Sequence, residues 1–149
     1  MNKIALIINY DKKNAYAVAS ELVSFLKDKA EVYCPDTYKE IPLGVTPVEE
    51  EKLFSLCRVV AVLGGDGTII ATAKKCAEHK NILLGINIGN LGYLSTFESS
   101  NLSNAARLLL SDDIHYDDRY MLCVRIFSSG KETMCYHALN EIVLSRADG

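Results

Sequence analysis

The segment Arg58–Ala77, RVVAVLGGDGTIIATAKKCA, decides the fold of this chain. It opens with the β-branched apolar run Arg58–Leu63, turns through the glycine-rich pentapeptide Gly64–Thr68, and continues in a helical pattern. A short apolar run that does not alternate with polar residues predicts a strand buried on both faces, as in parallel sheets. The segment therefore predicts a strand, a tight loop and a helix, the repeating unit of an α/β fold.

The same alternation extends to both sides of this segment. Apolar runs predict further strands, and apolar residues at helical spacing predict amphipathic helices. These are strands at Lys3–Asn9, Val32–Cys34 and Ile82–Ile86, and helices at Ala15–Lys29 and Leu102–Leu110. The pattern predicts a doubly wound, Rossmann-like parallel-sheet domain over residues 1–112, with ligands bound beyond the carboxyl ends of the strands.

One connection in this domain carries all three prolines of the chain. Segment Pro35–Pro47 is expected to be an irregular surface connection. A helix is expected to follow it, with Thr46 as its cap, Pro47 at the first helical position and Glu49 three residues after the cap, as in a capping box. Leu53 and Leu56 would supply the buried side of this helix.

The pattern changes after Asp113, where β-strand signals follow one another without a convincing helix. Met121–Phe127 and Met134–Leu144 read as two strands of a hairpin. Residues 113–149 are therefore expected to be the beginning of a β-rich second domain that stops unfinished. Because a two-stranded hairpin is marginal by itself, we expect this tail to be poorly supported or to dimerise or aggregate through an exposed edge.

The composition excludes several classes of partner and location. The chain has 149 residues, 49% of them hydrophobic, and a net charge of -3 without any block of like charge, so nucleic acid and anionic membranes are not expected as partners. Its purest apolar run, Val59–Leu63, is far shorter than a membrane span requires. A cytoplasmic protein is expected.

Five cysteines form no C-x-x-C pair, and their odd number argues against a complete disulfide framework. They are expected to be reduced thiols in the core, at Cys34, Cys57, Cys76, Cys123 and Cys135. A zinc site would have to draw on His79, His115 or His137, but these histidines are scattered without the spacing typical of metal ligands.

The pentapeptide Gly64–Thr68 is the strongest candidate for chemistry. A loop between a buried strand and a helix offers backbone N–H groups at the positive end of the helix dipole, which suits phosphate, and its glycines permit close approach and positive φ. A carboxylate at Asp66 beside phosphate would ligate a cation or accept a proton from an attacking hydroxyl. The alternative is a simple glycine turn in which Asp66 caps the helix. The chain has neither a Walker A motif nor the G-x-G-x-x-G fingerprint.

Gly-Gly-Asp-Gly-Thr at 64–68 resembles the signature shared by NAD kinases and the diacylglycerol and sphingosine lipid kinases. Segment Gly85–Leu94, GINIGNLGYL, is similar to the second NAD-kinase motif, which usually ends Leu-Gly-Phe-Leu, and Tyr93 preserves its aromatic ring. Ala138–Leu144, ALNEIVL, resembles the strand whose Asn-Glu pair holds the dinucleotide in NAD kinases. Arg119 and Leu122 fit the Arg-x-x-Leu pattern that opens that family's second domain. Lipid kinases would carry a Gly-Thr-Asn-Asp type of segment in the second loop, so the NAD kinases are favoured.

The resemblance implies an ATP-dependent kinase that phosphorylates the adenosine ribose 2′-hydroxyl of NAD to give NADP. Asp66 would act as the general base, and a divalent metal, with Mg²⁺ expected, would neutralise the triphosphate, although no protein ligand for it can be named. Oligomers are usual in the family. The residues expected to bind nucleotide are Gly64, Gly65, Asp66, Gly67, Thr68, Asn87, Tyr93, Asn140 and Glu141.

Two departures from the family pattern keep alternatives open. Ala71 stands where NAD kinases often carry a basic residue, so that contact is missing or passes to Lys74 or Lys75. The family also continues for over a hundred residues past the Asn-Glu strand, including a Gly-Ser-Thr-Ala-Tyr segment, whereas this sequence stops at Gly149. We expect a fragment. A catalytically silent nucleotide-binding module is the alternative, and a lipid kinase relative is the least favoured.

Overall fold

The computed structural model describes residues 1–89, 92–143 and 145, and it divides into two compact units. Unit 1 comprises residues Met1–Tyr116, and unit 2 begins at Asp117. Among the described residues, none of the helices combines the length and the apolar character needed to span a membrane.

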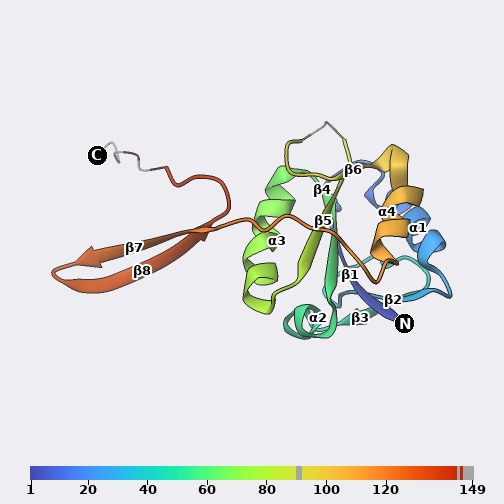
Figure 1. Ribbon diagram of the computed structural model, residues 1–149, viewed down its shortest axis with the longest axis horizontal. Helices are drawn as coiled ribbons and strands as arrows, with labels where there is room; N and C mark the ends of the chain where they lie inside the picture. Colours follow the sequence, from blue (N-terminus) through green and yellow to red (C-terminus); the bar gives the residue numbers. More distant parts are fainter. Residues whose placement is uncertain (90–91, 144, 146–149) are drawn as a thin grey trace. The chain divides into compact units, whose positions relative to one another are not determined.

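Unit 1 is built on a six-stranded sheet in which every pairing is parallel (Figure 1). Its strands are β1 (Asn2–Ile8), β2 (Ala30–Pro35), β3 (Val45–Val48), β4 (Val59–Gly64), β5 (Ile82–Asn87) and β6 (Phe97–Glu98). They lie in the order β3-β2-β1-β4-β5-β6. The order reverses between β1 and β4, which is where doubly wound sheets open a crevice for ligands.

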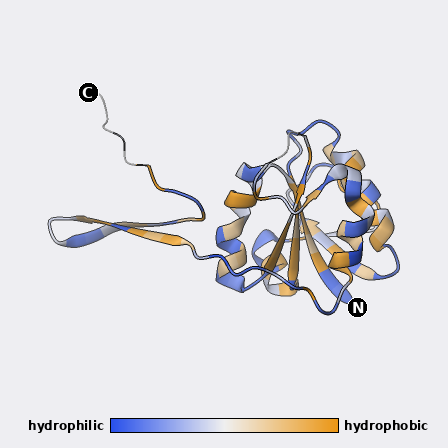
Figure 2. Cartoon of the chain, turned by 45° about the horizontal axis from the view of Figure 1, so that its top comes forward, coloured by the Kyte–Doolittle hydropathy of each residue, from blue (hydrophilic) through white to orange (hydrophobic). Residues whose placement is uncertain are grey.

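Four α-helices cover the two faces of this sheet. They are α1 (Ala15–Leu26), α2 (Glu50–Leu56), α3 (Asp66–His79) and α4 (Leu102–Leu109), the last preceded by a 3-10 turn at Ser99–Asn101. Buried residues of α1 and α4 pack in one core cluster, and those of α2 and α3 pack in the other. Figure 2 shows the apolar strands enclosed between these two helical layers. The predicted doubly wound α/β class is confirmed.

Strand β4 explains why the sheet has two cores. All six of its residues are buried. Because side chains alternate along a strand, Val59, Ala61 and Leu63 enter one cluster while Val60 and Val62 enter the other. Burying a side chain of this size contributes roughly 1.5–3 kcal/mol. The apolar run that predicted this fold is therefore a fully buried central strand, and its end at Gly64 fixes where the glycine loop begins.

The predicted capping box is wrong. Thr46 and Pro47 lie in strand β3, where they pair with Tyr33 and Cys34 of β2, and helix α2 begins only at Glu50. No side chain caps α2. Strand β3 is at the edge of the sheet, so the N–H group that proline lacks is not required by a second neighbour. Pairing with β2 therefore shortens the expected irregular connection, which ends before Val45.

The cysteine prediction holds for three of the five positions. Cys34, Cys57 and Cys76 are buried in unit 1, and burial raises the pKa of the Cys76 thiol to about 12, which makes it inert. Cys123 and Cys135 are exposed, so their assignment to the core was wrong. They lie on two strands, Leu122–Ser128 and Lys131–Ala138, whose residues are nearly all exposed.

Unit 2 contains an antiparallel hairpin of β7 (Leu122–Ser128) and β8 (Lys131–Ala138), the predicted β-rich segment. Ser129 and Gly130 at the turn have positive φ angles of 51° and 77°. A two-residue hairpin turn that matches the right-handed twist of the strands requires positive φ at both positions. Nearly every residue of both strands is exposed. The second strand ends at Ala138, so the prediction that it runs through Asn140 and Glu141 was wrong; Leu144, its predicted last residue, lies outside the described residues.

Candidate functional site

A cavity of about 640 Å³ opens in unit 1 at the point where the strand order reverses. Residues following β1 and β4 meet the first turns of α3 there, as expected for a ligand site beyond the carboxyl ends of parallel strands. The lining residues are Asn9, Lys12, Gly65, Asp66, Gly67, Thr68, Ala71 and Gly92. Four of the predicted nucleotide-binding residues, at positions 65–68, are thus brought together.

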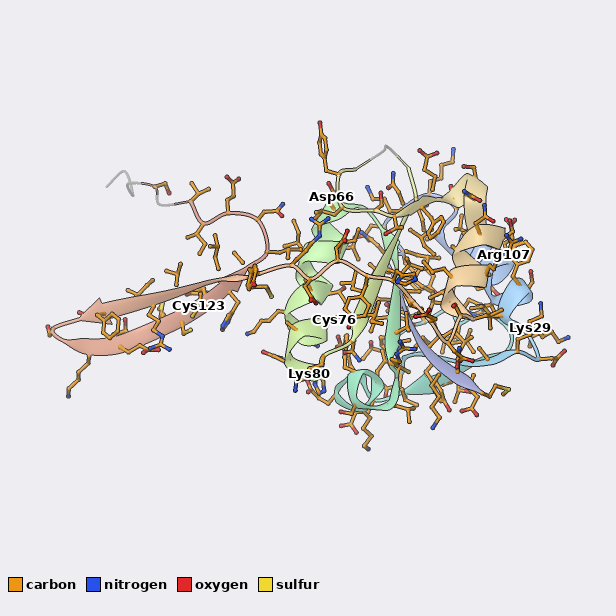
Figure 3. The ribbon with its side chains drawn as sticks, in the orientation of Figure 1. Lys29, Asp66, Cys76, Lys80, Arg107 and Cys123 are labelled. Atoms are coloured by element: carbon orange, nitrogen blue, oxygen red, sulfur yellow. The ribbon has the colours of Figure 1, made fainter. Side chains whose placement is uncertain are left out.

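Asp66 is the first residue of α3, at the end opposite Lys80 in Figure 3. Its side chain is half-buried and is held by the second glycine loop: Oδ2 accepts the backbone N–H of Tyr93 at 2.9 Å, and Oδ1 accepts that of Leu94 at 3.1 Å. Each carboxylate oxygen keeps a further lone pair for another donor. The carboxylate is therefore fixed in orientation while it remains available to a ligand in the cavity.

Gly92 is required by this arrangement. A Cβ at that position would lie 2.7 Å from the Asp66 Cγ and 2.9 Å from Oδ2, closer than real Cβ contacts. The absence of a side chain lets the backbone of the second loop approach the carboxylate. The first and second glycine motifs of the sequence are therefore two halves of one structure, with Asp66 as their point of contact.

The glycines of the first loop are explained by the lack of a side chain and not by a positive φ. Positive-φ glycines in the described chain are Gly44, Gly89 and Gly130, and none belongs to the pentapeptide, so that part of the prediction was wrong. A Cβ on Gly64 would lie 2.5 Å from Thr68 Oγ1, whereas Gly65 and Gly67 have nothing within 4 Å of that position. Gly64 is thus needed for packing, and the other two leave the cavity open.

Asn9 is a site residue that sequence analysis missed. Its Nδ2 donates to Thr68 Oγ1 at 3.0 Å, and its backbone N–H donates to the Leu63 carbonyl at 2.9 Å. It joins the end of β1 to both ends of the glycine loop. The available signal was its position directly after a buried strand, at the same sheet edge as Gly64.

Lys12 is the second site residue that the sequence did not predict, and it is the basic side chain among the residues that line the cavity. Ala71 also lines the cavity, so the position at which the family resemblance led us to expect a basic residue faces the site. Lys74 and Lys75 are not among the lining residues; they lie near Glu78 at 3.9 Å and Glu50 at 2.7 Å, respectively. The basic residue lining the site comes instead from the connection between β1 and α1.

The remaining predicted residues are placed differently. Asn87, the last residue of β5, is buried and pairs in register with Gly64 of β4, so it lies at the same sheet edge. Tyr93 is 99% exposed and is not among the lining residues of the cavity, and its backbone N–H donates to Asp66. Asn90 and Leu91 of the second motif lie outside the described residues.

Asn140 and Glu141 belong to unit 2, where both are exposed. They follow the end of β8 and are not paired in its ladder. Asn140 can donate and accept hydrogen bonds, and Glu141 as a carboxylate only accepts, so the pair can recognise a ligand of both polarities.

The cavity combines three features that suit nucleotide phosphates with a fourth, a carboxylate, that suits a hydroxyl group. The amino end of α3 carries partial positive charge, Lys12 adds a full one, and Gly65 and Gly67 leave room beside the backbone. Asp66 supplies an oriented proton acceptor among them. Oxygen atoms from Asp66, Thr68 and Asn9 also match the ligand preference of a hard divalent cation.

Comparison of the sequence with known proteins finds NAD kinases. Residues 4–114 match the family model described as the ATP-NAD kinase N-terminal domain. The chain is 31% identical to an NAD kinase of Heliobacterium modesticaldum, covering 99% of this chain and 53% of the relative. It is 33% identical to an NAD kinase of Clostridium tetani, covering 99% of this chain and 52% of the relative.

A solved structure shares the fold. The crystal structure of yeast NADH kinase complexed with NADH matches with a TM-score of 0.67 at 16% sequence identity, covering 94% of this chain and 47% of that one. The chain therefore spans about half the length of the relatives that it matches.

Proposed function

The chain belongs to the ATP-NAD kinase family, and on that premise we propose that it carries the nucleotide site of an ATP-dependent NAD kinase. The reaction transfers the terminal phosphoryl group of ATP to the 2′-hydroxyl of the adenosine ribose of NAD, which gives NADP and ADP. The observation that carries this proposal is the Asp66 carboxylate, held at the cavity by two backbone N–H groups of the second glycine motif.

Asp66 is the general base of the proposed reaction. It accepts the proton of the 2′-hydroxyl as the hydroxyl oxygen attacks the terminal phosphorus, and the bond from that phosphorus to the ADP oxygen breaks. A base must be held within hydrogen-bond reach of the proton it removes. The hydrogen bonds from Tyr93 and Leu94 fix the carboxylate without occupying all of its acceptor positions.

The surrounding residues bind and orient the phosphates. The amino end of α3 and Lys12 stabilise negative charge, and such reactions depend mainly on positioning and charge stabilisation. The divalent ion, Mg²⁺ by expectation, enters as part of the MgATP substrate and lowers the charge of the triphosphate. Asn9 positions Thr68 through its hydrogen bond to Oγ1.

The proposal also gives nucleotide-binding roles to four residues that do not line the cavity. Asn87 belongs to the nucleotide site at the end of β5, Tyr93 contacts nucleotide through its exposed ring, and Asn140 with Glu141 binds the dinucleotide. The proposed location of the protein is the cytoplasm, which suits its unpaired cysteines, and the family resemblance suggests a homo-oligomer.

A product assay tests the activity. The purified chain is incubated with MgATP and NAD and assayed for NADP, while calorimetry measures NAD binding in parallel. NADP formation supports the kinase. Binding of NAD without NADP would contradict it and favour the alternative, a silent nucleotide-binding module. Phosphate transfer to diacylglycerol or a sphingoid base would instead identify a lipid kinase relative.

A further inference from the structure

Unit 2 brings three metal-binding side chains together on one surface of its hairpin. Cys123 lies on β7, and Cys135 and His137 lie on β8 (Figure 3 labels Cys123). The two thiol sulfurs and a ring nitrogen of the histidine are all within 4.8 Å of one another, and the sulfurs are 3.5 Å apart. Sequence spacing gave no sign of this group, because its members come from two strands.

The strand register explains the juxtaposition. Cys123 pairs directly with His137, and Cys135 pairs with Arg125, the next residue on the same face of β7. Directly opposed and diagonal side chains on one face of an antiparallel pair are close enough to interact. The ladder is regular through these pairs, and its single irregularity, between Ile126 and Phe127, lies nearer the turn. The backbone thus holds the three side chains in place.

We propose that Cys123, Cys135 and His137 form a binding site for a thiophilic divalent metal of the zinc class. Thiolate and imidazole are the ligands that zinc prefers, and a Cys₂His set leaves a fourth position for water or another donor. Two sulfurs bound tetrahedrally at about 2.3 Å from zinc lie about 3.8 Å apart. The observed separation of 3.5 Å therefore needs little adjustment to accept the ion.

The competing role for these cysteines is redox or nucleophilic chemistry. A nucleophilic thiol would need only one of the two sulfurs, whereas the structure gathers both sulfurs and the histidine ring nitrogen within 4.8 Å of one another. A disulfide would leave His137 without a part in the cluster. A metal uses all three side chains, and it would cross-link β7 to β8 in a unit that has little buried surface.

Cobalt(II) titration of the reduced full chain, without oxygen, tests the proposal. The expected result is one ion bound per chain, a sulfur-to-cobalt charge-transfer band, and displacement by zinc. Cys135→Ser and His137→Gln should each weaken binding by roughly 100-fold or more, since even indirect partners of a metal site change affinity by about 10–100-fold. His115→Gln is the matched control, because His115 is an exposed histidine outside the cluster and should leave binding unchanged.

His137→Cys guards against loss of structure as the explanation. It keeps three ligands, so it should retain metal binding with a stronger charge-transfer band. Absence of the band in the wild-type chain would overturn the proposal, and so would a Cys135→Ser variant that binds cobalt as tightly as the wild type. Recovery of Cys123 and Cys135 as a disulfide whose reduced form binds no cobalt would also overturn it. None of these outcomes depends on kinase activity, so this test is independent of the proposed function.

Discussion

Unit 1 and unit 2 hold their candidate functional residues in opposite ways. In unit 1, Asp66 follows a strand whose residues are all buried, and two backbone N–H groups fix its carboxylate. In unit 2, Asn140 and Glu141 follow a hairpin that is exposed along nearly all of its length. A packed sheet edge can orient a catalytic group to a fraction of an ångström, whereas a lone hairpin needs further contacts to do so.

The largest expected effect is a loss of folding stability, tested by replacing one leucine in each unit. Leu63 is fully buried in β4 and Leu122 is 50% exposed in β7. Leu63→Ala should lower the free energy of unfolding by about 2–5 kcal/mol, because it leaves a cavity in a close-packed core. Leu122→Ala should change it by less than about 0.5 kcal/mol. Urea denaturation followed by far-ultraviolet circular dichroism measures both, and equal losses would contradict the distinction between the units.

The next effect, within unit 1, is a loss of turnover that comes from displacing the Asp66 carboxylate and not from a loss of folding stability. Gly92→Ala should displace the Asp66 carboxylate, because its methyl group would overlap that side chain. We expect kcat for NADP formation to fall about 100-fold, as for other small misplacements of a reacting group, with little change in unfolding free energy. Steady-state kinetics and denaturation together check this. Normal kcat would show that the second glycine loop does not position Asp66.

A smaller effect is expected at the cation of the cavity. Lys12→Ala should raise KM for MgATP about 10-fold, which corresponds to about 1.4 kcal/mol, and should leave kcat largely unchanged. Lys13→Ala is the matched control, since Lys13 is an exposed neighbour that does not line the cavity. If the two variants behave alike, Lys12 does not contact the phosphates.

The smallest effect tests a residue whose role was predicted wrongly. Loss of a helix cap usually costs about 1 kcal/mol of stability. Thr46 lies in edge strand β3 and caps nothing, so Thr46→Ala should change the unfolding free energy by less than about 0.5 kcal/mol. Denaturation of this variant decides between the two roles, and a loss near the capping value would restore the original interpretation.

Much of the fold was predictable because its signals are local. Uninterrupted apolar runs marked β1, β4 and β5, and helical spacing marked α1, α3 and α4. The errors occurred where pairing between distant segments decided the outcome. Thr46 and Pro47 have the local chemistry of a helix start, but β2 offered them a strand partner. Strand β6, with two residues, is too short to leave a periodic pattern.

The site was predictable only in part, for a similar reason. The motif identified Asp66 and its glycines, which are neighbours in sequence. Asn9 and Lys12 reach the cavity from the end of β1. The position of Asn9 after a buried strand indicates the sheet edge, but its local sequence does not identify Thr68, more than fifty residues away, as its partner. Tyr93 was singled out for its ring, and its backbone N–H bond to Asp66 could not be predicted, because any residue except proline could supply it.

If Asp66 is the base of an NAD kinase, Asp66→Asn should lose turnover while it keeps its affinity for NAD. Asparagine keeps the shape of the side chain but cannot accept the proton. We expect NADP formation to fall by about 100-fold or more, the contribution typical of general base catalysis, while the calorimetric Kd for NAD stays within about twofold of wild type. Near-normal turnover in this variant would show that Asp66 is not the base.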